Sequence, residues 1–271
     1  MAHLVDVANP ADARLDDFRN LNSIDRRPDL PSGKGLVIGE GVLVVQRMLA
    51  SRFSPFAVMG NDRRLGDLRE DLAAVDIPYY RVDADVMAQV VGFHLNRGVL
   101  AAARRPPMLT VRDVIKDART LAVLEGVNDH ENLGSIFRNA AGLGVDAVVF
   151  GPGCADPLYR RAVRVSMGHA LLVPCASVET WRGDLNLLRE NGFQLLAMTP
   201  DPDAATLAGA MAQVGDGKVA ILVGAEGPGL THRAMQASDM RVRIPMSRGT
   251  DSLNVATAAA LAFYERVRLA R

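Results

Sequence analysis

Three short segments in the second half of the chain carry residues whose types and spacing suit ligand binding. Residues 132–140 include an asparagine and an arginine, residues 222–229 form a glycine-rich turn, and residues 244–254 join Ile-Pro-Met to Ser-Leu-Asn. Glycine, proline and small polar residues at strand ends leave backbone groups open to a ligand. Because three such segments follow in order within an α/β pattern, they predict one composite site for a nucleotide-like ligand.

Each charged or amide side chain in these segments also has a plain structural interpretation. Arg138 is expected to face away from the sheet, where an arginine commonly forms a surface ion pair. Glu226, the only charge in the glycine-rich turn, is either an exposed loop residue or a partner for an arginine or a ribose hydroxyl. Asn254 is expected in the first turn of an alanine-rich helix. Of these side chains, it is the one that a purely structural role explains least well.

The elements that position these residues begin near residue 118. Apolar runs without polar alternation predict strands buried on both faces, and helical periodicity separates the runs. This pattern is typical of an α/β fold with a mostly parallel sheet and helices on both faces. The predicted strands are 119–125, 145–150, 170–174, 193–198, 218–223 and 240–244, and the predicted helices are 132–142, 157–165, 180–190, 229–237 and 252–269. Asn132 is expected to cap the first of these helices, and Asp251 or Ser252 the last.

A smaller α/β pattern precedes this region. Short β-rich and helical runs alternate between residues 35 and 102, and a helix is predicted near 11–20. The prolines at 106 and 107 break both helix and strand. We therefore expect three parts: residues 1–105 with an N-terminal extension 1–32, a linker 106–117, and residues 118–271.

Composition excludes several classes of protein. The 271 residues carry 31 basic and 31 acidic side chains, which argues against a nonspecific polyanion binder held by bulk charge. Arginines still cluster locally, and each cluster is expected either to pair with nearby acids or to contact phosphates. The clusters are Arg26-Arg27, Arg160-Arg161 with Arg164, and Arg241, Arg243 with Arg248.

Neither a membrane protein nor a metalloprotein is indicated. No apolar run approaches the roughly 20 residues of a membrane helix, and the N-terminus does not look like a signal peptide, so a cytoplasmic location is expected. Cys154 and Cys175 lack metal-ligand spacing and histidine partners, so no metal site is predicted.

The three segments together resemble the motifs of the SpoU (TrmH-type) ribose 2′-O-methyltransferases of the SPOUT superfamily. The matches are N-x-G-x-x-x-R-x-A at 132–140, G-x-E-x-x-G at 224–229, and I-P-M at 244–246 with S-L-N-V at 252–255. Ala256 stands where many members have serine. Residues 33–103 look like the ribosomal-protein-like substrate-binding domain that precedes the catalytic domain in many members.

This resemblance implies an S-adenosylmethionine-dependent enzyme acting on an RNA ribose. The cofactor-binding residues that it implies are Thr199, Gly224, Ile244, Pro245, Met246 and Leu253. The catalytic residues that it implies are Asn132, Arg138, Glu226, Ser252 and Asn254. It also implies a deep trefoil knot in the catalytic domain, a homodimer through that domain, and an RNA partner rather than DNA, with rRNA favoured over tRNA.

The chemistry of methyl transfer suggests a role for Arg138. A ribose hydroxyl must lose its proton while it attacks a sulfonium methyl in line, so the site must align the oxygen and stabilise its developing charge. Arginine is a poor base because its pKa exceeds about 12. We therefore favour Arg138 as the group that orients and stabilises the oxyanion, with an RNA phosphate as proton acceptor, over Arg138 acting as the base.

Two other classes of function are kept as alternatives. A non-catalytic RNA-binding or ribosome-binding module of the same fold is one, although intact Arg138, Glu226 and Asn254 argue against it. A dinucleotide-binding enzyme is the other, but it requires a G-x-G-x-x-G turn after the first strand of the sheet. The residues after strand 119–125, Gly126-Val-Asn-Asp, do not supply that turn.

Overall fold

The computed structural model describes residues 1–21, 35–247 and 251–269, which form two compact units. The first unit contains Met1–Pro107 and Asp156–Leu172, and the second contains Met108–Ala155 and Val173–Arg271. Residues 156–172 therefore pack with the first unit, although they lie in the middle of the region expected to form the second.

The first unit is built on a five-stranded mixed sheet with the order β1-β4-β3-β5-β2. The pairs β1–β4 and β3–β4 are parallel, whereas β5 pairs antiparallel with β3 and β2. The strands are β1 His3–Asp6, β2 Leu36–Glu40, β3 Pro55–Gly60, β4 Pro78–Arg81 and β5 Val99–Arg104. The helices are η1 Ala13–Phe18, α1 Val42–Leu49, α2 Asp62–Asp67, α3 Arg69–Ala73, α4 Ala84–Val91, α7 Arg160–Val165 and η3 His169–Leu171.

In this unit one predicted strand is wrong, and one observed strand was not predicted. The apolar run 170–174 is not a strand: Ala170 and Leu171 lie in the 3-10 helix η3, and their side chains are buried. A short apolar run does not distinguish a strand from a buried helical turn, and here packing against the first unit's core decides. Strand β1 was not expected, because its four residues are mostly exposed and it is an edge strand paired to β4 alone.

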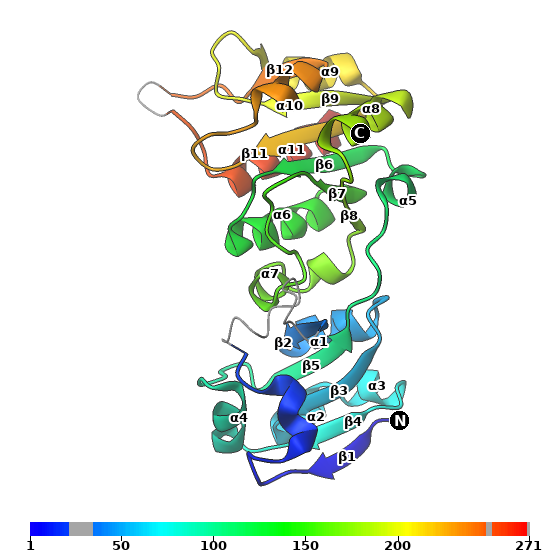
Figure 1. The fold of residues 1–271 in the computed structure, drawn as a ribbon, viewed down its shortest axis with the longest axis vertical. Coiled ribbons are helices and arrows are strands. Elements are labelled where there is room, and N and C mark those ends of the chain that lie inside the picture. The colour runs from blue at the N-terminus through cyan, green and yellow to red at the C-terminus, as the bar shows by residue number, and fades with distance from the viewer. Residues whose placement is uncertain (22–34, 248–250, 270–271) are drawn as a thin grey trace. The chain divides into compact units, whose positions relative to one another are not determined.

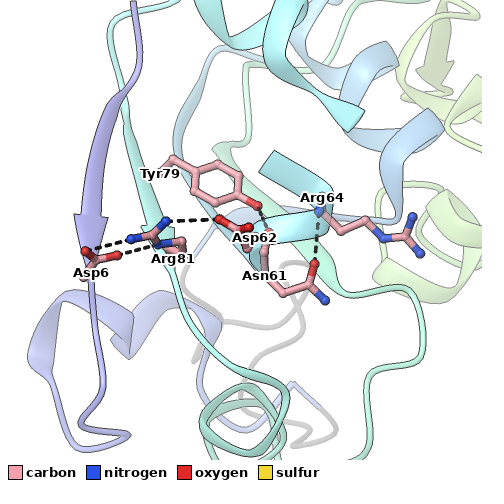
Figure 2. A network of polar contacts seen from close by, with 6 residues as sticks. All are labelled: Asp6, Asn61, Asp62, Arg64, Tyr79 and Arg81. Atoms are coloured by element: carbon pink, nitrogen blue, oxygen red, sulfur yellow. Dashed lines mark hydrogen bonds and ion pairs between the residues drawn. The ribbon is translucent and has the colours of Figure 1, made fainter. Parts of the chain in front are cut away.

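Polar side chains link the ends of the parallel strands of this first sheet (Figure 2). The Arg81 guanidinium donates to both carboxylate oxygens of Asp6, at 2.6 and 3.0 Å, and to Asp62 at 3.1 Å. These carboxylates raise the pKa of Arg81 above its usual value. The hydroxyl of Tyr79 donates to the carbonyl of Asn61 at 2.9 Å, and burial raises the pKa of Tyr79. Asp6 and Asp62 thus provide the hydrogen-bond acceptors and the opposite charge for Arg81 within the unit.

The second unit is built on a seven-stranded sheet with the order β10-β12-β9-β11-β6-β7-β8, and all of its pairs are parallel. Figure 1 shows β12, β9, β11, β6, β7 and β8 stacked in this order. The strands are β6 Thr120–Glu125, β7 Ala147–Phe150, β8 Cys175–Ser177, β9 Phe193–Met198, β10 Ala205–Thr206, β11 Lys218–Gly224 and β12 Met240–Arg243. The helices are α5 Val111–Ile115, α6 His130–Gly142, α8 Trp181–Glu190, α9 Leu207–Val214, α10 His232–Ala237 and α11 Val255–Leu269.

Helices cover both faces of this sheet, as the near-continuous apolar strands predict. On one face, residues of α5, α8 and α10 form one core cluster with strand residues such as Val149 and Leu222. The next residue of β7, Phe150, points to the other face, where its ring lies 5.9 Å from that of Phe137 in α6. Helix α11 packs against α6 and β11.

The predicted α/β class with a mostly parallel sheet is confirmed, and most predicted strands lie within two residues of the observed ones. Two helices were not predicted. Helix α5 lies inside the expected linker and begins with a capping box between Thr110 and Asp113, and α9 follows β10. None of the helices in the described part of the chain has the length and apolar character needed to cross a membrane. The trefoil knot stays a prediction.

Arg266 is a buried cation that fixes helix α11 to the turn before β11. Its guanidinium donates to the carbonyls of Gly215 and Gly217 and to the hydroxyl of Thr120. The residue is only 5% exposed, and burial lowers the pKa of its guanidinium. The three acceptors offset the cost of burying the charge.

We expect Arg266→Ala to lower the free energy of unfolding by about 3 kcal/mol, because it removes the three hydrogen bonds of a buried side chain and opens a void. Urea denaturation followed by circular dichroism measures this change. Arg268→Ala is the matched control, since Arg268 is exposed on the same helix and pairs with Glu265 three residues away. Equal denaturation midpoints for the two variants would contradict the anchoring role of Arg266.

Candidate active site

The glycine-rich turn after β11 is closed by its own backbone. The amide of Gly229 donates to the carbonyl of Ala225 at 2.9 Å, so residues 225–229 fold back beside the strand end. Gly224 lies against this turn: a β-carbon there would lie 2.2 Å from the carbonyl carbon of Gly229 and from the amide nitrogen of Leu230. Only glycine fits at position 224, because the neighbouring atoms belong to the backbone and cannot rotate away.

We expect Gly224→Ala to weaken binding of S-adenosylhomocysteine at least tenfold, because the turn must open by more than 1 Å to accept the methyl group. Isothermal titration calorimetry measures the affinity. Gly142→Ala is a suitable control, since Gly142 lies in helix α6 with nothing within 4 Å of the added carbon, and it should bind as tightly as the wild type. Unchanged affinity in Gly224→Ala would contradict the tight fit of this turn.

A buried carboxylate, not singled out from the sequence, fixes the far end of the same turn. Glu125, the last residue of β6, is 4% exposed and lies in register with Gly224. Its two oxygens accept from the amide and the hydroxyl of Thr231, both at 2.8 Å. Thr231 in turn caps helix α10. The signal available in the sequence was an acid at the end of an apolar strand.

Asn254 joins all three predicted segments. Its side-chain oxygen accepts from the amides of Ala256 and Thr257, which makes Asn254 the N-cap of helix α11. Its side-chain nitrogen then faces the other way and donates to Asn132 Oδ1 at 2.7 Å and to Glu226 Oε1 at 2.9 Å. The expectation that Asp251 or Ser252 caps this helix is therefore wrong. Asn254 can cap the helix and join the segments at once, because its side-chain oxygen and nitrogen bond to groups on opposite sides.

Asn132 lies in the first turn of helix α6 and not at its cap. Asp129 occupies the cap position and accepts from the amides of Glu131 and Asn132, so the helix begins two residues earlier than expected. This leaves the Asn132 side chain free to accept from Asn254. Helices α6 and α11 are tied a second time by Asn139, whose side-chain nitrogen donates to the carbonyl of Ala256 at 3.1 Å.

A pocket of about 350 Å³ opens beside this cluster, at the carboxyl ends of β9, β11 and β12. Eight of the predicted site residues line it: Thr199, Gly224, Glu226, Ile244, Met246, Ser252, Leu253 and Asn254. Pro245 is absent from the described lining, and so are Asn132 and Arg138. The volume is that of a small-molecule site. The charged side chains in the described lining are the carboxylates of Glu226 and Asp251.

Arg138 is the predicted site residue that the structure does not bring into this cluster. It lies six residues after Asn132 on α6, which places it about 9 Å along the helix and about 240° around its axis. Its side chain is exposed, and no residue in the described ranges forms a hydrogen bond or ion pair with it. The guanidinium is therefore available to a substrate or to a second protein chain.

The arginine clusters noted in the sequence are largely engaged. Arg160 pairs with Glu40, which is buried, and stacks on the ring of Phe93. Arg241 pairs with Asp201 at 3.2 Å. Arg243 donates to the carbonyl of Ala204, while Arg26, Arg27 and Arg248 lie outside the described residues. Pairing within the fold thus accounts for Arg160 and Arg241.

Comparisons with known proteins identify the family of the chain. The model of the "SpoU rRNA Methylase family" matches residues 119–264. A protein of Mycobacterium tuberculosis named as an uncharacterized tRNA/rRNA methyltransferase is 73% identical over 263 residues, which cover 97% of this chain and 91% of that protein. RlmB of a Burkholderia species, a 23S rRNA (guanosine-2′-O-)-methyltransferase, is 31% identical over 211 residues, covering 76% of this chain and 84% of RlmB.

A solved structure shares the whole fold. The AdoMet-bound rRNA methyltransferase from Sinorhizobium meliloti superposes with a TM-score of 0.81 at 21% identity, covering 98% of each chain. The family match covers the three segments that meet at Asn254 and the pocket beside them. The chain therefore belongs to the SpoU rRNA methylase family and is an S-adenosylmethionine-dependent RNA methyltransferase.

Proposed function

We propose that this protein transfers the methyl group of S-adenosylmethionine to a ribose 2′-hydroxyl of rRNA. The observation that carries the proposal is the pair of hydrogen bonds from Asn254 to Asn132 and Glu226. These bonds join the three motifs at the mouth of the pocket. The 2′-O position and the rRNA substrate are also those named for RlmB, the relative that is 31% identical.

The pocket suits S-adenosylmethionine in size and charge. Gly224 lines it and has no room for a β-carbon, because the backbone of its own turn packs against it. The carboxylates of Glu226 and Asp251 favour a cationic ligand. Thr199, Ile244, Met246 and Leu253 would hold the cofactor, which when bound supplies an electrophilic methyl group on a sulfonium.

The chain's own residues would align the reacting oxygen and stabilise its charge. Asn254 holds Glu226 and Asn132 in one arrangement, which keeps the pocket mouth fixed before RNA arrives. Arg138 would donate to the ribose oxygen as it loses its proton, and an RNA phosphate would accept that proton. Ser252, exposed at the pocket lining, would order the cofactor loop.

Substrate selection and assembly complete the proposal. The first unit would recognise a folded or single-stranded element of the RNA, and the enzyme would act in the cytoplasm as a homodimer through its catalytic unit. Exposed apolar side chains on α11 support the dimer: Leu261 is 41% exposed and Tyr264 is 55% exposed. Sedimentation equilibrium of the full chain distinguishes a dimer from a monomer.

Methyl transfer to RNA tests the activity. The full chain is incubated with tritiated S-adenosylmethionine and rRNA from cells that lack the protein, either deproteinised or in ribosomal subunits. We expect stable incorporation at one site, and resistance of that site to alkaline cleavage, because a 2′-O-methyl group removes the hydroxyl that cleaves the chain. Label that enters RNA without producing such resistance would contradict ribose methylation.

The same assay separates the enzyme from a non-catalytic RNA-binding module of the same fold. A module would bind RNA tightly yet incorporate no label into any RNA or ribosomal particle. Transfer to tRNA but not to rRNA would keep the enzyme and overturn the choice of substrate.

A further inference from the structure

A second concave region lies in the catalytic unit, away from the residues of the candidate active site. It is a groove of about 660 Å³ between helices α8 and α10, and its lining includes Trp181, Arg182, Asn186, Arg189, Arg233 and Gln236. None of these residues belongs to the three motif segments, 132–140, 224–229 and 244–255. Within the described residues, the lining contains no aspartate or glutamate. We define this region as the α8–α10 groove.

Two of the three arginines that line the α8–α10 groove have no acidic partner among the described residues. Arg189 pairs with Asp239 at 2.8 Å, but Arg182 and Arg233 are exposed and pair with no acid in the described ranges. Some arginines elsewhere are paired with acids: Arg81 lies between two aspartates, and Arg241 lies beside Asp201. Two unpaired guanidiniums, in a described lining that contains no carboxylate, suit this groove to anions.

The remaining lining residues suit a nucleic acid more than a small anion. Arg182 and Arg189 lie seven residues apart on α8, which separates them by about 10 Å along the helix axis. Such a separation exceeds the size of one phosphate group. Trp181, Asn186 and Gln236 add an aromatic ring and two amides, which are the groups that contact bases and sugars in single-stranded RNA.

The groove begins at the same edge of the sheet as the candidate active site. The ring of Trp181 packs on Gly151, just after the carboxyl end of β7. Helix α10 begins at His232, and the buried Glu125 holds its N-cap, Thr231, at the carboxyl end of β6. The turn that carries Glu226 into the pocket therefore continues directly into the helix that carries Arg233.

We propose that the α8–α10 groove binds the phosphodiester backbone of a single-stranded segment of the RNA substrate. The inference rests on the proposed function for the identity of the RNA, and it adds a substrate-binding surface within the catalytic unit. Arg182, Arg189 and Arg233 contact phosphates and give affinity, and the sequence of the segment is read elsewhere.

Charge reversal in the groove tests this inference. Full-length protein carrying Arg182→Glu and Arg233→Glu is compared with the wild type for binding of a fluorescein-labelled 20-nucleotide oligouridylate, by anisotropy at several salt concentrations. We expect the dissociation constant to rise at least tenfold in the double variant. The slope of log affinity against log salt should become shallower by about 1.4, since each phosphate contact on a single strand contributes about 0.7.

A matched control removes the effect of net charge. Arg112→Glu with Lys116→Glu changes the charge by the same amount at two exposed positions in and just after α5, outside the groove. This control should bind the oligouridylate within about twofold of the wild type. Both double variants should bind S-adenosylhomocysteine normally, which shows that the catalytic unit remains folded.

The results separate this inference from the proposed function. Equal loss of affinity in the two double variants, or none in either, overturns the groove assignment. A groove variant that binds RNA normally but no longer associates with ribosomal subunits also overturns it, in favour of a protein partner. If the wild type transfers no methyl group while the groove variant alone loses RNA affinity, the proposed function fails and the groove assignment stands.

Discussion

Arg138→Ala should lower the turnover number for methyl transfer about 10³-fold while leaving the affinity for S-adenosylhomocysteine unchanged. The guanidinium is exposed, without a partner among the described residues, and absent from the described pocket lining, so its loss should remove the proposed contact to the reacting ribose and none to the cofactor. Single-turnover incorporation of tritium into RNA measures the first quantity, and calorimetry measures the second.

Arg138→Lys sharpens this experiment, because lysine keeps the charge but loses the planar fork of donors. We expect it to recover only a small part of the activity. Equal losses of methyl transfer and cofactor affinity in Arg138→Ala would place the residue at the cofactor and refute its assignment to the ribose oxygen.

Asn254→Asp should lower kcat/KM for RNA about 10²-fold while it keeps the cap of helix α11. Aspartate caps a helix as well as asparagine, so the bonds from Ala256 and Thr257 are kept. The nitrogen that donates to Asn132 and Glu226 is replaced by an oxygen, which sets a second carboxylate against Glu226. Asn132 and Glu226 are then no longer held in one arrangement beside the pocket.

Asn254→Ala provides the comparison, since it removes both sets of bonds. It should lose similar activity and also about 1 kcal/mol of stability through the missing cap, measured by urea denaturation. Full activity in Asn254→Asp would mean that Asn254 serves only as a helix cap.

Mixing the Arg138→Ala and Asn254→Asp proteins tests whether one active site is formed by one protomer or by two. Arg138 does not contact Asn254, Asn132 or Glu226 within one described chain. If the proposed dimer combines Arg138 of one chain with the Asn254 cluster of the other, a mixture of Arg138→Ala and Asn254→Asp proteins recovers part of the activity. If both residues act within one chain, the mixture stays inactive.

Much of the second unit could be predicted from the sequence because its central strands are mostly apolar. β9 was predicted with its observed bounds, and β6 and β11 to within one residue, since doubly covered strands give long apolar signals. β12 was also predicted to within one residue, although it contains Arg241 and Arg243. The predicted strand at 170–174 was wrong because Ala170 and Leu171 are buried in the first unit and not in this sheet. Periodicity alone does not say which core a segment joins.

The site was predictable in its residue types but not in its local roles. The caps of α6 and α11 were assigned to Asn132 and to Asp251 or Ser252, whereas Asp129 and Asn254 occupy them. Several nearby residues could accept the same backbone amides, and the choice depends on what else each side chain can bond. Glu125 was missed for a related reason: its partner Thr231 lies more than a hundred residues later.

The placement of residues 156–172 limits how the protein can be divided. Leu158, Val163 and Leu171 belong to the same core cluster as Val44 and Met48 of the first unit. The backbone therefore passes between the units three times, and no single cleavage point separates them. A fragment starting at residue 108 would carry these three leucine and valine side chains into solvent, and a fragment ending at residue 107 would have a hole where they belong.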